Sequence, residues 1–135
     1  MESKLIDIIN KKLVPRLNPA FIIVFGSYAK GCPREDSDID IAFYSEGLTP
    51  DKYEIFMLAQ ELAEELKIEV DLINLREAST VFKAQIFTTG KVIYSQNEDT
   101  RIKEQMIALS MYAKLNEERH EILDGISKRG TIYEE

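Results

Sequence analysis

The first part of the chain changes from a helical spacing of apolar residues to a continuous apolar run. Residues 3–13 carry leucine and isoleucine on one face at the spacing of an amphipathic helix, and Pro15 is expected to end it. Residues 20–25 are uninterrupted apolar positions, rich in β-branched and aromatic side chains, which is typical of a buried strand. Gly26 and Ser27 follow directly and predict a sharp turn at its end.

The next apolar pattern alternates and predicts a strand with two different faces. Between the two strands, residues 28–37 are expected to form a loop or a single helical turn, because Gly31 and Pro33 interrupt them. Residues 38–44 then alternate in polarity, and successive side chains of a strand point to opposite sides. One side carries Asp38, Asp40 and Ala42, and the other Ile39, Ile41 and Phe43.

The rest of the chain predicts helices and strands in alternation and a long final helix. The expected elements are a helix capped by Thr49, with Pro50 in its first position, through Lys67; a strand over 68–75; a helix over 77–87; a strand over 91–95; and a helix from Glu98 to about Asp124. This succession indicates one α/β domain. We expect residues 1–97 to form its core and residues 98–135 a helix and tail packed on it.

Composition and charge narrow the classes of function. Hydrophobic residues make up 44% and charged residues 30% of the 135-residue chain, so a core can form. A single cysteine, Cys32, rules out an intramolecular disulfide, and no segment resembles a signal peptide or a membrane span. We therefore expect a soluble cytoplasmic protein without membrane contact. The net charge of −7 disfavours binding to long nucleic acids, although a nucleotide could still bind through a divalent cation.

The turn after the first strand and the two aspartates of the second suggest one site. A glycine after a buried strand lets a phosphate approach the backbone, and Ser27 adds a hydroxyl donor. Ten residues separate Ser27 from Asp38, enough for the chain to return beside the first strand. Asp38 and Asp40 would then lie close together on one face, where Mg2+ or Mn2+ would neutralise their repulsion.

A phosphate-binding turn beside paired carboxylates is suited to phosphoryl or nucleotidyl transfer with two metal ions. A third carboxylate is then needed to bind the second metal or to act as a base. Asp71, on the strand over 68–75, is the candidate, with Glu69 in reserve. Lys30 and Arg34, in the loop, are candidates for contacts with the phosphate tail.

With these residues the chain resembles the polymerase-β-like nucleotidyltransferases, and within them the minimal nucleotidyltransferase (MNT) branch. Gly26-Ser27, ten residues and Asp38-Ile39-Asp40 match the signature of that superfamily. The resemblance covers nearly the whole chain and implies a mixed sheet flanked by helices, with Mg2+ as cofactor and ATP as donor. Many members of the branch are antitoxins that transfer AMP to a tyrosine of a HEPN-domain ribonuclease toxin encoded beside them. The resemblance thus implies such a toxin as the partner.

The same residues also allow other interpretations. Asp36, Asp38 and Asp40 imitate the start of a calcium-binding loop, but Ile41 and Gly47 stand where that loop needs glycine and glutamate. Two alternatives to an AMP-transferring antitoxin stay open: nucleotidyl transfer to a small molecule such as an aminoglycoside, and a binding module that neutralises its partner by masking it.

Overall fold

The computed structural model describes residues 3–29, 38–47 and 49–128. Its elements in chain order are α1 (Ser3–Leu17), β1 (Phe21–Phe25), β2 (Ile39–Tyr44), α2 (Lys52–Leu66), β3 (Val70–Asn74), the 3-10 turn η1 (Leu75–Glu77), α3 (Thr80–Thr89), β4 (Lys91–Ser95) and α4 (Glu98–Lys128).

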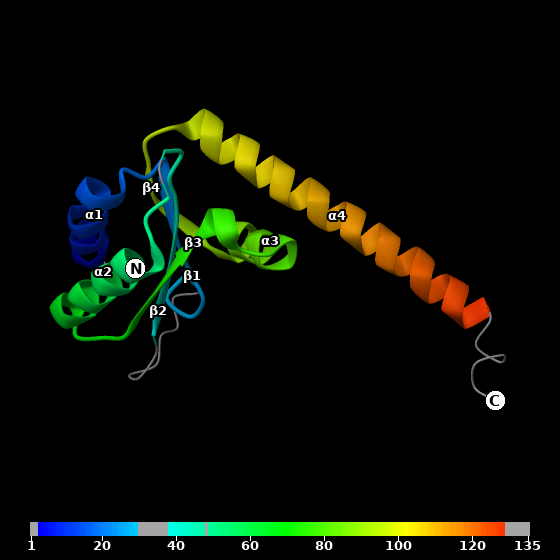
Figure 1. Cartoon of the computed structure of the whole chain (residues 1–135), viewed down its shortest axis with the longest axis horizontal. Helices are drawn as coiled ribbons and strands as arrows, with labels where there is room; N and C mark the ends of the chain where they lie inside the picture. The colour runs from blue at the N-terminus through cyan, green and yellow to red at the C-terminus, as the bar shows by residue number, and fades with distance from the viewer. Residues whose placement is uncertain (1–2, 30–37, 48, 129–135) are drawn as a thin grey trace.

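The strands form one mixed sheet in the order β3-β2-β1-β4. Strand β1 pairs antiparallel with β2 and with β4, while β2 and β3 are parallel. Helices α1 and α2 lie on one side of this sheet, and α3 and α4 on the other (Figure 1). The expected mixed sheet flanked by helices, with a long C-terminal helix, is confirmed.

Both faces of the sheet are covered, which explains why β1 is apolar at every position. All five of its residues are buried. Ile22 and Val24 join the cluster under α1 and α2, whereas Phe21, Ile23 and Phe25 join the cluster on the other face. Alternate residues of a strand point to opposite faces, so a central strand covered on both sides needs no polar position.

Helix α1 continues through Pro15 to Leu17, so the prediction that Pro15 ends it is wrong. A proline inside a helix lacks the N–H that would bond to the carbonyl four residues earlier. Two interactions nevertheless hold the last turn: the Leu17 side chain is buried, and its carbonyl accepts a hydrogen bond of 2.8 Å from the Ser45 hydroxyl. The helix ends at Leu17, and Asn18, which follows, has a left-handed φ of 44°.

Two helix starts also differ from those expected. Asp51, rather than Thr49, caps α2, and its carboxylate accepts a hydrogen bond of 2.7 Å from the Glu54 N–H. A carboxylate and a threonine hydroxyl can both accept a capping hydrogen bond. Only the carboxylate adds a negative charge that complements the positive end of the helix dipole. Helix α3 begins at Thr80 instead of residue 77, because the Ser79 hydroxyl caps it after the turn η1.

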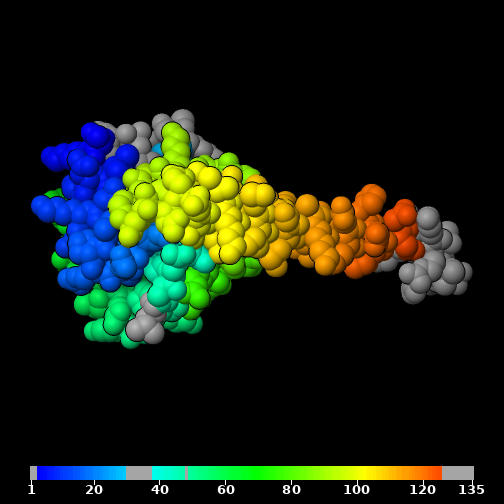
Figure 2. All heavy atoms as spheres, turned by 90° about the horizontal axis from the view of Figure 1, so that it is seen from above, coloured from blue at the N-terminus to red at the C-terminus, as the bar shows by residue number. Residues whose placement is uncertain are grey.

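Helix α4 has an inner half, residues 98–115, and an outer half, residues 116–128. Its inner half lies over α3, and Ala108 is buried there. Figure 2 shows the outer half projecting beyond the rest of the molecule as a single helix. Among the described residues, no helix is long and apolar enough to cross a membrane.

Candidate active site

The pairing of β2 with β3 places two of the predicted carboxylates side by side. Asp40 of β2 lies directly opposite Asp71 of β3 in the parallel register. Asp38 precedes β2 and has the parity of Asp40, while Ile39 and Ile41 between and after them are fully buried on the other face. The structure therefore places Asp71 beside the strand that carries Asp38 and Asp40, from which the sequence separates it by more than thirty residues.

Gly26, directly after the neighbouring strand β1, lies against the Asp40 carboxylate. Phe25, the last residue of β1, lies opposite Asp40 in the antiparallel register. Gly26 follows with a φ of 74°, in the left-handed region that side chains disfavour. A Cβ atom built on it would overlap Oδ2 of Asp40 and lie 3.3 Å from its Cγ. The Asp40 carboxylate thus occupies the space that only a glycine leaves open.

The electrostatics of Asp40 reflect this crowding. Burial raises the pKa of its carboxyl above the usual value, and the negative charges of Asp71 and then Asp38 raise it further. Each cause disfavours the ionised form of Asp40 in the protein alone. A cation between the three carboxylates would reverse all of them, because it would replace the lost hydration and screen the mutual repulsion.

The donor set fits a hard divalent cation, since Mg2+ and Mn2+ bind carboxylate oxygens in preference to softer ligands. Within the described ranges, however, no three side chains of the ligand-forming types already stand in a metal-binding arrangement. A bound cation would have to draw Asp38, Asp40 and Asp71 closer together. Asp38 and Asp71 are exposed at the edge of the site and can turn inward without disturbing the core.

Of the remaining predicted residues, the structure describes Ser27 and Glu69. Ser27 follows Gly26 in the turn and is half-buried. Glu69 is exposed just before β3, where its carbonyl accepts a hydrogen bond of 2.9 Å from the Ile39 N–H. Lys30 and Arg34 lie outside the described residues, as does Cys32.

An aromatic pair beside Asp40 was not predicted from the sequence. Phe25 and Phe82 of α3 meet edge to face with their ring centroids 5.6 Å apart. Because Phe25 lies opposite Asp40 on the same face of the sheet, this pair forms an apolar wall beside the carboxylate. The position of Phe25 directly before Gly26 was the available signal. Phe82 gave none, since its place depends on how α3 crosses the sheet.

Comparison with known families identifies this arrangement. The family model described as polymerase beta, nucleotidyltransferase, matches residues 3–99, which contain the sheet, the Gly26 turn and all three aspartates. The chain belongs to the polymerase-β nucleotidyltransferase family. This family member therefore has the fold of a nucleotidyltransferase and the carboxylates expected for that chemistry on a single face of its sheet.

Relatives with known names and structures agree with this assignment over most of their length. The protein adenylyltransferase MntA of Shewanella oneidensis is 38% identical over 125 residues, covering 93% of this chain and 86% of MntA. A chain from a crystal structure of a toxin–antitoxin with AMP-PNP superposes with a TM-score of 0.79 at 36% identity, covering 90% of this chain and 98% of that one. A chain from a structure of tri-AMPylated Shewanella oneidensis HEPN toxin in complex with MNT antitoxin gives a TM-score of 0.75 at 34% identity, covering 94% and 99%.

Proposed function

We propose that this nucleotidyltransferase is an antitoxin that transfers AMP from ATP to a tyrosine hydroxyl of a cognate HEPN-domain ribonuclease toxin and thereby neutralises it. We place this reaction in the cytoplasm. The observation that carries the proposal is the meeting of Asp38, Asp40 and Asp71 at the Gly26 turn. The relatives support the choice of acceptor, since one is named a protein adenylyltransferase and another was solved with an AMPylated HEPN toxin.

In this proposal the turn after β1 binds the triphosphate. The left-handed φ of Gly26 lets the backbone approach a phosphate closely, and Ser27 offers its hydroxyl and its N–H as donors. Lys30 and Arg34, which follow in the chain, would bind the phosphate tail with their positive charges. Together these groups would hold the α-phosphorus in front of the carboxylates, oriented for attack from the side of the acceptor.

Asp38 and Asp40 would hold the first divalent cation, and Asp71 would either help to hold a second or accept the proton of the tyrosine hydroxyl. When bound, Mg2+ or Mn2+ stabilises the leaving pyrophosphate and lowers the pKa of the attacking hydroxyl. The tyrosine oxygen forms a bond to the α-phosphorus as the bond to the β-phosphate oxygen breaks, and pyrophosphate leaves. Asp71 is suited to receive the proton because it is exposed and lies opposite Asp40.

Transfer to a small molecule has less support than transfer to a protein. An aminoglycoside would need a binding surface of its own, and the chain already matches the protein adenylyltransferase MntA over 93% of its residues. Neutralisation by masking alone would not require the three carboxylates. Their burial and mutual repulsion destabilise the fold when no cation is bound, so masking alone does not explain them.

The proposal is tested by incubating the protein with Mg2+ and labelled ATP, with and without the purified HEPN-domain protein encoded beside it. Wild type should label that protein on tyrosine, whereas Asp38→Ala/Asp40→Ala should label it at least about a hundredfold more slowly, because the cation site is lost. Gly47→Ala serves as the control, since a Cβ at this position meets nothing within 4 Å. Undiminished labelling by the double variant would contradict the proposal.

A further inference from the structure

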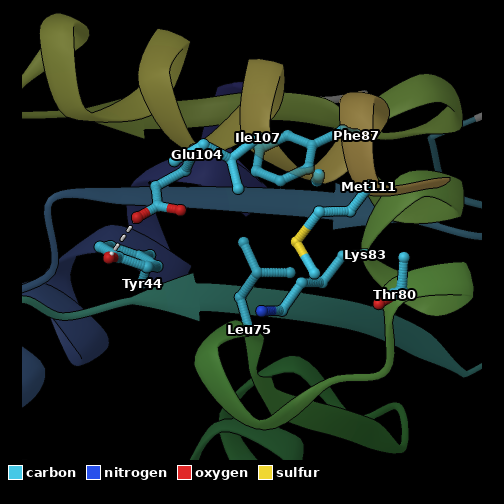
Figure 3. Close-up of a pocket in the computed structure, with 9 residues that line it drawn as sticks. Tyr44, Leu75, Thr80, Lys83, Phe87, Glu104, Ile107 and Met111 are labelled. Carbon is cyan, nitrogen blue, oxygen red and sulfur yellow. Dashed lines mark hydrogen bonds between the residues drawn. The ribbon is translucent and has the colours of Figure 1, made fainter. Parts of the chain in front are cut away.

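The inner half of α4 is fixed to the sheet by specific contacts. The Tyr44 hydroxyl of β2 donates a hydrogen bond of 2.6 Å to Glu104, and the Thr100 hydroxyl donates one of 2.9 Å to Glu46. Farther along, Ala108 is buried and Met111 reaches toward Lys83 of α3 in the small cavity of Figure 3. These contacts set the direction in which the helix leaves the domain.

The outer half of α4, residues 116–128, extends past the domain (Figure 2). Every residue from Asn116 to Asp124 is exposed, and the space-filling view shows a single rod there (Figure 2). The rod from residue 116 to 128 is roughly 20 Å long. Most of the stability of a helix in a protein comes from tertiary packing of its apolar face, which the exposed turns of this rod lack. A second molecule that covers it would supply what the domain does not.

The apolar face that packs on α3 continues along the outer half. Met111, Leu115 and Ile122 are spaced by four and seven residues, so they share one side of the helix. Met111 lines the cavity over α3, Leu115 is half-buried, and Ile122 is 61% exposed. The face therefore begins against this domain and runs out beyond it.

We propose that this face of α4, formed by Leu115 and Ile122 and here termed the docking arm, binds the HEPN-domain toxin and holds it beside the carboxylates. This inference rests on the proposed function and names the surface through which the protein substrate is recruited. Helix α4 lies on the same side of the sheet as α3 (Figure 1). Asp40 points to that side as well, because it alternates with Ile39 and Ile41, which face α1 and α2.

Charge favours a different protein over a second copy of this chain as the occupant. The arm itself is nearly balanced in charge, since residues 114–128 contain Glu117, Glu118, Glu121 and Asp124 against Lys114, Arg119 and Lys128. Two copies of the whole chain would nevertheless repel, because each carries a net charge of −7. A ribonuclease must present cationic groups to its RNA, so it offers the complementary charge.

The solved relatives point to the same occupant. The MNT-antitoxin complex matches 94% of this chain, which leaves about 8 of its 135 residues unmatched, far fewer than the 31 residues of α4. The match therefore includes most of α4, and the matched structure contains a HEPN toxin. A helix that finds no cover in its own domain is thus retained in a protein that is bound to a second one.

The test compares Leu115→Glu/Ile122→Glu with Ala113→Glu/His120→Glu. Both double variants add two carboxylates at matching heights along α4, but the second pair lies on the opposite side of the helix. Glutamate preserves helix propensity, and the exposed single variant Ile122→Glu provides a version that does not touch the half-buried Leu115. Labelling rates are measured with Mg2+, ATP and increasing concentrations of the HEPN-domain protein, alongside the affinity for AMP-PNP.

The docking arm predicts that Leu115→Glu/Ile122→Glu raises the KM for the HEPN-domain protein roughly tenfold or more, with kcat at saturation and AMP-PNP affinity unchanged. Ile122→Glu alone should show the same effect in smaller measure, and the control pair should match wild type. A wild-type KM in both arm variants, or an equal loss in the control pair, would overturn the inference. Failure of the proposed function looks different: in a direct binding measurement, wild type would still bind the HEPN-domain protein more tightly than Leu115→Glu/Ile122→Glu does, but it would label nothing.

Discussion

Replacing Gly26 by alanine perturbs the site at the point where β1 meets Asp40. With its φ of 74°, residue 26 would hold an alanine in the left-handed region at a cost of about 1 to 2 kcal/mol. The added methyl would also overlap Oδ2 of Asp40, so that carboxylate must rotate away. For a domain of this size we expect the melting temperature to fall by roughly 3 to 8 °C. Because a displacement of about 1 Å can cost a hundredfold in rate, we expect AMP transfer to fall by at least that factor.

The assay measures both effects on the same preparations, by thermal unfolding and by labelling of the HEPN-domain protein. Gly47→Ala is the matched control, because its added Cβ meets nothing within 4 Å and no positive φ is required. It should stay within about 0.5 kcal/mol of wild type in stability and keep full activity. A second comparison places Gly26→Ala in an Asp40→Ala background, where the overlap is gone and only the backbone cost should remain.

Two results would refute this reasoning. If Gly26→Ala unfolds at the temperature of wild type, the left-handed backbone at this position carries no cost. If it loses stability but transfers AMP at the wild-type rate, the position of the Asp40 carboxylate is unimportant for the reaction, and its assignment to the cation site is wrong.

Three further predictions follow from the charges and hydrogen bonds of the structure. Without divalent cations, Asp40→Asn should be at least as stable as wild type at pH 7. Because folding raises the pKa of Asp40, the stability that the protonated carboxyl contributes is lost as pH rises through that pKa. The advantage of the variant should therefore vanish below about pH 4, as measured by urea unfolding across pH. Added Mg2+ should raise the melting temperature of wild type and leave that of Asp38→Asn/Asp40→Asn unchanged; an equal rise in both would place cation binding elsewhere. Tyr44→Phe removes the hydrogen bond to Glu104 and should cost about 1 kcal/mol. Burial and Glu104 raise the pKa of Tyr44 to about 12. The greater stability of wild type over this variant should therefore be fully present below about pH 10 and lost as pH rises through 12. A stability difference that does not change with pH would be inconsistent with that bond.

The sequence was most informative where local pattern and tertiary structure agree. The uninterrupted apolar residues 20–25 and the alternation of residues 38–44 predicted strands that the structure has as β1 (Phe21–Phe25) and β2 (Ile39–Tyr44). The number of covered faces determines the polarity of a strand. The spacing of Gly26, Asp38 and Asp40 predicted that they meet, and in the structure Gly26 directly follows β1 and lies against Asp40 of the adjoining β2.

The sequence was less informative where one interaction chooses between near-equal alternatives. Thr49 and Asp51 are both acceptable caps, and only the contact of Asp51 with Glu54 decides between them. A proline usually ends a helix, but α1 continues past Pro15. The burial of Leu17 and the hydrogen bond from the Ser45 hydroxyl to its carbonyl outweigh the backbone hydrogen bond that the proline cannot make. The pairing of Asp40 with Asp71 depends on the register of two strands far apart in the chain, which no local spacing encodes.

One measurement tests the central claim most directly: whether neutralisation outlasts the complex. The HEPN-domain protein is incubated with this nucleotidyltransferase, Mg2+ and ATP, separated from it, and assayed for ribonuclease activity and for AMP on tyrosine by mass spectrometry. Catalysis at Asp38, Asp40 and Asp71 predicts that the separated protein stays inactive and carries AMP, and that it does neither after incubation with Asp38→Ala/Asp40→Ala. Recovery of full ribonuclease activity after separation from wild type, with unmodified tyrosines, would contradict the account.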